Sequence, residues 1–192
     1  IDYSNDTATA PAKGPLDTAR SLSGATSAAA DALPTNTGLI TIFNVATDLR
    51  DNVFPQGTDF GYFGGGSPSG PHLSTVDRID YSNDTAAAAT KGPLSSARSY
   101  LGATSSASFG YFGGGNGVVS LVDRVDYSND TATALAKGPL SVTRNKSGST
   151  GNASFGYFAG GQTPSAVSSV DRINYSNDTA TAAVKGPLSS AR

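Results

Sequence analysis

The sequence predicts an all-β fold assembled from internal repeats, and two observations lead to this prediction. The first is a phrase, D-Y-S-N-D-T-A, that occurs four times in the 192 residues, once with Asn in place of the first Asp. The second is the composition, which has 23 Gly and 10 Pro but no Cys, Met, Trp or Glu. Small and β-branched residues between turn formers favour short strands, and a recurring phrase is typical of repeat architectures.

The repeated phrase keeps the same neighbours along the chain. K-G-P-L follows every copy, V-D-R precedes three of them, and F-G-Y-F occurs three times. The four copies begin at Asp2, Asp80, Asp126 and Asn174. Their tyrosines are 78, 46 and 48 residues apart. After the first interval the period is therefore about 46–49 residues, the size of one supersecondary unit.

The sequence of the unit from Leu94 to Gly138 predicts four strands. Ala97–Ser105 is the first strand and consists mostly of small residues. Ser108–Gly113 is the second strand and carries three aromatic residues. Gly113–Gly117 is expected to be the loop that leads to the third strand.

The third strand is predicted over Val118–Tyr127, where alternation separates two faces. One face holds Val119, Leu121, Asp123 and Val125, and the other holds Val118, Ser120, Val122, Arg124 and Asp126. Ser128–Asp130 is expected to form a tight turn, because Asn and Asp hydrogen-bond their own backbone. Thr131–Ala136 is a weak fourth strand. Four strands in about 45 residues match the size of a propeller blade.

These motifs resemble the kelch repeat over most of the chain. V-D-R-x-D-Y-S-N-D-T resembles its hydrophobic–x–Arg–Tyr–Asp strand and turn, G-P-L-S-S-A-R its linker, and F-G-Y-F-G-G-G its double glycine. The matching glycine pairs are Gly64-Gly65, Gly113-Gly114 and Gly160-Gly161, and the linker arginines are Arg20, Arg98, Arg144 and Arg192. The chain departs from the family in lacking Trp after the turn and in the order D-Y. The resemblance implies kelch-like β-propeller blades, each a four-stranded antiparallel unit.

The wording of the repeat, D-R-I-D-Y-S-N-D-T with K-G-P-L-S, also resembles repeats in predicted structural proteins of marine viruses, particularly cyanobacterial phages. This resemblance implies a structural or adhesive protein of a virion or tail fibre. Its partners would be other copies, virion proteins, or a host-surface glycan or protein. The alternative is a secreted or cell-surface scaffold of the same fold that binds a protein or glycan, and both readings place the chain in a virion or outside the cell.

We expect one repeat domain over residues 1–192. Residues 1–20 would be half a unit, followed by units at 21–97, 98–143 and 144–192. The long first interval places extra residues at about 25–59, either as a degenerate blade or as an inserted loop. Three and a half units predict an incomplete propeller, unless the extra segment supplies a blade or copies assemble.

Composition argues against several functions. With a formal net charge of −2, the chain lacks the excess of basic residues that is typical of a nucleic-acid binder. The sequence contains no run of about 18 apolar residues, so we expect no membrane insertion. With no Cys, no Glu and a single histidine, His72, we expect no enzyme, no catalytic or metal-binding residues and no cofactor. The D-x-S-N-D turns are rich in oxygen but lack the glycine and glutamate of a calcium loop.

Two recurring groups carry alternative interpretations. The adjacent Asp and Arg of V-D-R should face opposite sides of their strand, so that one of them bridges neighbouring units, and this favours a structural role over a ring of ligand-binding residues. The aromatic residues of F-G-Y-F either line a sugar-binding surface or form the core between units. Their recurrence at one position in every unit favours the core.

Any binding is expected in segments that differ between otherwise similar units. These segments are Gly38–Pro55, Ser67–Leu73, Asn116–Val118 and Gln162–Ala166. The candidate contact residues are Phe43, Arg50, Phe54, His72, Asn116 and Gln162.

Overall fold

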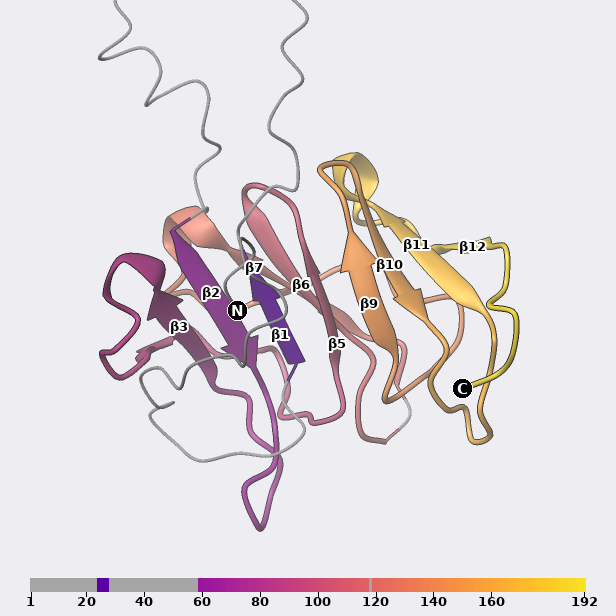
Figure 1. Cartoon of the computed structure of the whole chain (residues 1–192), viewed down its shortest axis with the longest axis horizontal. Helices are drawn as coiled ribbons and strands as arrows, with labels where there is room; N and C mark the ends of the chain where they lie inside the picture. Colours follow the sequence, from indigo (N-terminus) through magenta and orange to yellow (C-terminus); the bar gives the residue numbers. More distant parts are fainter. Residues whose placement is uncertain (1–23, 28–58, 118) are drawn as a thin grey trace, which may run out of the picture.

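The computed structural model describes residues 24–27, 59–117 and 119–192 (Figure 1). These residues form twelve β-strands in three four-stranded antiparallel sheets, with three short 3₁₀ turns and no longer helix. The prediction of an all-β fold is confirmed. The sheets follow one another in chain order along the molecule (Figure 1). No closed ring is formed by the described residues.

Each sheet is a meander in which every strand is hydrogen-bonded to its neighbours in sequence. Sheet 1 contains β1 (Gly24–Ser27), β2 (Phe60–Gly64), β3 (Val76–Asp80) and β4 (Ala89–Lys91). Sheet 2 contains β5 (Gly102–Ser105), β6 (Phe109–Gly113), β7 (Val122–Asp126) and β8 (Leu135–Ala136). Sheet 3 contains β9 (Gly148–Gly151), β10 (Phe155–Ala159), β11 (Val170–Asn174) and β12 (Ala183–Lys185).

The three sheets share one strand register. The F-G-Y-F strand pairs residue for residue with the V-D-R strand, so that the central tyrosine is opposite the arginine in every sheet. These pairs are Tyr62 with Arg78, Tyr111 with Arg124, and Tyr157 with Arg172. A residue in one sheet therefore has defined equivalents in the other two.

The first strand of sheet 2 is shorter than the sequence predicts. It begins at Gly102 rather than Ala97. Tyr100 has a left-handed φ of 59°, which is incompatible with a strand. The amide of Arg98 donates to the carbonyl of Leu73 at 2.9 Å, so this part of the linker is tied to a loop of sheet 1.

The last strand of sheet 2 is also shorter, Leu135–Ala136 rather than Thr131–Ala136. The amide of Ala134 donates to the carbonyl of Pro93 at 2.8 Å, in the linker that follows sheet 1. The residues before Leu135 therefore bind a neighbouring unit instead of their own sheet.

The structure describes only part of the units that the sequence predicts at the N-terminal end. Gly24–Ser27 pairs with β2 and completes sheet 1. The expected half unit at 1–20, most of the 25–59 segment, and Phe43, Arg50 and Phe54 lie outside the described residues.

The hydrophobic core lies between the sheets. Sheet 1 contributes Tyr62 and Val76, and sheet 2 contributes Phe112 and Val125, all at most 2% exposed. The equivalent core between sheets 2 and 3 contains Tyr111, Val122, Phe158 and Ile173. Sheet 2 is thus covered on both faces, which explains why both alternating sets of its strand residues are buried.

Two glycines make room for the aromatic rings of the next sheet. A Cβ at Gly64 would lie 2.8 Å from the Phe112 ring, and one at Gly113 would lie 2.7 Å from the Phe158 ring. Both distances are shorter than a normal carbon–carbon contact. The glycine that ends each F-G-Y-F-G strand is therefore required for close packing of the sheets.

We predict that Phe112→Ala lowers the free energy of unfolding by roughly 3–5 kcal/mol, because it opens a cavity between sheets 1 and 2. Leu135→Ala is the control, since Leu135 is 57% exposed, and it should change stability by at most about 0.5 kcal/mol. Urea unfolding measures both values. Equal losses in the two variants would show that the sheets are not packed as described.

Candidate functional site

A cluster of polar side chains joins sheet 1 to sheet 2. Tyr62, Arg78 and Lys91 come from β2, β3 and β4, and they surround the carboxylate of Asp130 in the turn after β7. Tyr62 Oη and Arg78 Nη1 donate to Asp130 Oδ2 at 3.0 and 2.8 Å. Lys91 Nζ lies 3.3 Å from Oδ1. We call such a Tyr, Arg and Lys triad a socket, and the segment that enters it a Y-S-N-D turn.

The same arrangement joins sheet 2 to sheet 3. Tyr111, Arg124 and Lys137 form the second socket, and Asp178 supplies the carboxylate. The three distances are again 3.0, 2.8 and 3.3 Å. The contact is therefore a repeated feature of the architecture.

The Y-S-N-D turn also inserts its tyrosine ring. The rings of Tyr62 and Tyr127 stack with centroids 4.6 Å apart, and those of Tyr111 and Tyr175 with centroids 4.9 Å apart. Both pairs have an interplanar angle of 17°. The turn thus contributes an aromatic face and a carboxylate to the same socket.

The glycine of K-G-P-L lets the turn approach the linker. The amide of Gly92 donates to the carbonyl of Asp130 at 2.7 Å, and that of Gly138 to the carbonyl of Asp178 at 2.8 Å. A Cβ at Gly92 would lie 2.0 Å from the carbonyl oxygen of Ala132, and one at Gly138 would lie 2.0 Å from that of Ala180. No side chain fits in that space.

Local hydrogen bonds hold the Y-S-N-D turn in shape, as the sequence predicted. In sheet 2 the carboxylate of Asp126 accepts from the amide of Ser128 at 2.9 Å and from its hydroxyl at 2.6 Å. Asn174 accepts the same two bonds in sheet 3, since only an oxygen acceptor is needed. In sheet 1 the bonds from Ser82 lower the pKa of Asp80. The first acidic residue is thus a local cap, whereas the last one joins two sheets.

Burial sets the protonation of the socket tyrosines. It raises the pKa of Tyr62 and of Tyr111 well above the ordinary value, and the neighbouring carboxylates of Asp130 and Asp178 raise it further. The hydroxyls therefore stay protonated and act as donors at neutral pH.

A second buried contact ties each linker to the next sheet. Arg98 Nη2 lies 2.6 Å from Asp123 Oδ2, with side chains 4% and 0% exposed. Asp123 also accepts from the amide and hydroxyl of Ser95 at 3.1 and 2.6 Å. Arg144, Asp171 and Ser141 repeat the contact in sheet 3.

The Asp and Arg of V-D-R therefore face opposite sides, and both make contacts between units. Asp123 binds the linker that enters its own sheet, while Arg124 points to the socket for the next turn. The prediction that one member of each pair links neighbouring units is confirmed for Arg124, and Asp123 makes such a contact as well, through Ser95.

The described candidate contact residues lie in the loops between the second and third strands of the sheets. His72 Nδ1 lies 3.1 Å from Ser99 Oγ, and its Nε2 accepts from the side-chain amide of Asn116. This contact brings the loops of sheets 1 and 2 together. Gln162 instead exchanges two backbone hydrogen bonds with Asn145, at 3.0 and 3.2 Å, in an isolated bridge outside the strands of sheet 3.

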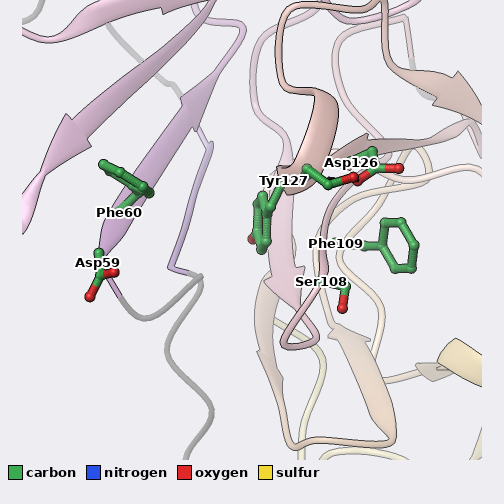
Figure 2. A pocket seen from close by; sticks show the side chains of 7 residues that line it. Asp59, Phe60, Ser108, Phe109, Asp126 and Tyr127 are labelled. Atoms are coloured by element: carbon green, nitrogen blue, oxygen red, sulfur yellow. Dashed lines mark hydrogen bonds between the residues drawn. The ribbon is translucent and has the colours of Figure 1, made fainter. Parts of the chain in front are cut away.

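A cavity of about 520 Å³ lies where β2 and β6 begin, at the end of sheets 1 and 2 that is opposite to these loops. Figure 2 shows Asp59 and Phe60, at the start of β2, on one side and Tyr127 on the other. Ser108 and Phe109, at the start of β6, also line it. The cavity combines aromatic rings with carboxylate and hydroxyl oxygens, the groups that bind a polyhydroxylated ligand.

The aromatic residues of F-G-Y-F divide between the core and the lining of this cavity. Tyr62, Tyr111, Phe112 and Phe158 are core residues with no exposed surface. Phe60 and Phe109 are only half-buried and line the cavity, with the guanidinium carbons of Arg78 and Arg124 at 4.0 and 4.1 Å from their ring centroids.

Two further features are absent from the residues that the structure describes. Among them no three His, Cys, Asp or Glu side chains gather into a metal site, and no helix is long and apolar enough to span a membrane.

In comparisons with known proteins, no family model and no curated protein matches this sequence.

We predict that Asp130→Ala lowers the free energy of unfolding by about 2–4 kcal/mol, because it leaves two cations and a tyrosine hydroxyl facing each other without an acceptor. Asp126→Ala, in the same turn, is the matched control and should lose only the local cap, about 1 kcal/mol. Urea unfolding separates the two. If Asp126→Ala proved the more damaging, the turn would act locally and the socket would contribute little.

The socket tyrosines predict a loss of stability in alkali. Because the pKa values of Tyr62 and Tyr111 are raised in the folded state, their contribution is complete below about pH 10 and falls as the pH rises above it. The double variant Tyr62→Phe with Tyr111→Phe should show a flatter decline in the free energy of unfolding above pH 10. A variant that declines as steeply as the wild type would contradict this assignment.

Proposed function

We propose that the chain is a non-enzymatic structural and adhesive module, built of kelch-like propeller blades and belonging to a phage virion or tail fibre. It presents loops for contact with a host surface or neighbouring subunits. The observation that carries the proposal is the socket, which recurs between sheets 1 and 2 and between sheets 2 and 3 with the same three distances.

The recurring residues support a structural role. The Tyr, Arg and Lys of each socket, the Asp of each turn and the Gly of each linker are all engaged in contacts between sheets. Catalysis requires one asymmetric group of side chains around a substrate. The strongest signal in this sequence is instead used identically at two places, which favours a scaffold.

The parts that vary between units support a role in presentation. The loops at Ser67–Leu73 and Gln162–Ala166 differ in length and sequence, and they occupy the same connection in their respective sheets. The hydrogen bond between His72 and Asn116 fixes the first of these loops to the equivalent loop of sheet 2. A stack of sheets that holds variable loops at one end is suited to contact with a larger surface.

The cavity favours a second candidate function, a cell-surface or secreted scaffold that binds a glycan. Phe60 and Phe109 offer aromatic rings for stacking on the apolar face of a sugar, while Asp126 and Ser108 offer hydrogen-bonding oxygens. This candidate shares the architecture and differs in the site of contact.

Binding to a glycan array and to intact cells tests both candidates. We predict that the triple variant His72→Ala, Asn116→Ala and Gln162→Ala weakens binding at least about tenfold, because it removes contacts from the presented loops. The pair Phe60→Ala and Phe109→Ala tests the cavity, and Leu135→Ala, on an exposed strand, is the control. If only the variant with Phe60→Ala and Phe109→Ala lost binding, the second candidate would be favoured. If this variant and the triple variant both bound as the wild type does, both candidates would be refuted.

A further inference from the structure

The loop between β6 and β7 contains the dipeptide Asn116-Gly117, and Asn is followed by Gly nowhere else in the sequence. An asparagine in front of a glycine is the arrangement that most readily loses its side-chain amide. The backbone nitrogen of the second residue attacks the side-chain carbonyl carbon of the first, and glycine has no Cβ to hinder this approach. The reaction is intramolecular, so its rate depends on whether these two atoms can meet.

The backbone at this dipeptide leaves room for the attack. Gly117 has a left-handed φ of 83°, a conformation that glycine adopts without a steric penalty. In the described part of the chain, a Cβ at Gly117 would meet Val119 Cγ1 at 3.8 Å and nothing closer. Asn116 and Gly117 are both exposed. Little in the described structure therefore hinders rotation of this peptide unit, and water can reach it.

The other described asparagines lack this combination, since each is followed by a residue with a side chain. They are Asn83, Asn129, Asn145, Asn152, Asn174 and Asn177. Asn152 is the best comparison, because it is also exposed in a loop, between β9 and β10, and is followed by Ala153. Its Oδ1 accepts from the backbone amides of Ser154 and Phe155, both at 2.9 Å. These bonds hold the side chain of Asn152 to its own turn.

We propose that Asn116 is a site of spontaneous deamidation in the folded protein, and that the modification reverses the hydrogen bond between Asn116 and His72. The Gly117 nitrogen forms a bond to Asn116 Cγ and loses its proton, while the bond from Cγ to Nδ2 breaks and ammonia leaves. Water then opens the cyclic succinimide at either of its carbonyl groups. The product is aspartate or isoaspartate; water is consumed, ammonia is released, and nothing is oxidised or reduced.

The contact with His72 makes the consequence specific. Asn116 Nδ2 donates to His72 Nε2, because an amide nitrogen donates and does not accept. Nε2 therefore carries no proton, and the proton of the neutral ring is on Nδ1, which lies 3.1 Å from Ser99 Oγ. The ring donates to Ser99 and accepts from Asn116.

Deamidation changes the direction of this bond. A carboxylate at position 116 only accepts hydrogen bonds, so His72 keeps the contact only by carrying a proton on Nε2. The modification also places a negative charge where the loops of sheets 1 and 2 meet. A neutral link between two loops thus becomes a link to an ionised group.

Peptide mapping by mass spectrometry tests the reaction, after incubation of the folded chain in mildly alkaline buffer. Asn116 should be converted to the acid at least about tenfold faster than Asn152 in the same sample. Asn116→Gln is the matched control, since glutamine keeps an amide donor but would have to form a larger ring. It should stay unmodified at this position. Methylation by an isoaspartyl methyltransferase measures the isoaspartate fraction.

Nitrogen–proton NMR of the imidazole ring tests the consequence. His72 is the only histidine in the sequence, so its ring signals are assigned without further variants. The fresh protein should carry the ring proton on Nδ1. The aged protein and Asn116→Asp should both carry a proton on Nε2, whereas Asn116→Gln should match the fresh protein.

The reaction is excluded if Asn116 of the folded chain keeps its amide as long as Asn152 does, while a parallel sample in urea loses it rapidly. The fold would then prevent the attack that the sequence allows. A ring that carries no proton on Nε2 in Asn116→Asp would overturn the predicted change at His72. The site lies on the loops that we propose for contact, but neither measurement involves binding, so a failure here is distinguishable from a failure of the proposed function.

Discussion

The buried carboxylate at each contact between sheets is the interaction on which this architecture depends. Asp130 and Asp178 have side chains only 9% and 8% exposed, and an isolated charge in such a place is strongly unfavourable. It is stabilised only because an arginine, a lysine and a tyrosine of another sheet point to it. The carboxylate and the three groups that bind it come from different sheets, so a change in any of the four side chains leaves the others without a partner. This interdependence explains why the repeated phrases vary so little.

The ion pairs and the apolar core have different effects on the fold. Burial of Tyr62, Val76, Phe112 and Val125 supplies most of the stabilisation, on the order of 1.5–3 kcal/mol for each side chain. A buried ion pair contributes less, because desolvation offsets much of its attraction. Its effect is geometric: the socket accepts a carboxylate at one position only, which fixes the register of each sheet against the next. Two contacts with identical distances are the result.

Much of the unit could be predicted from the sequence, because the signals are local. The alternation around Asp123, the tight turn and the order of four strands all follow from neighbouring residues. The strand ends could not be predicted, since the backbone at Ala134 binds Pro93 of another unit. The role of Asp130 was missed for the same reason, since Arg78 lies 52 residues away. One signal was present: Asn replaces Asp at position 174, where an acceptor suffices, whereas Asp178 remains acidic.

Equivalent residues in this chain differ in burial because their neighbours differ. Tyr111 is fully buried by sheet 3, and Tyr157, with the same place in its own sheet, is not. Sheet 3 retains the tyrosine, the arginine, the lysine and the linker glycine of sheets 1 and 2, and Val184 in its last strand is 62% exposed. The burial of a repeated residue is thus set by the sheet packed against it and not by the place of the residue in its own strand.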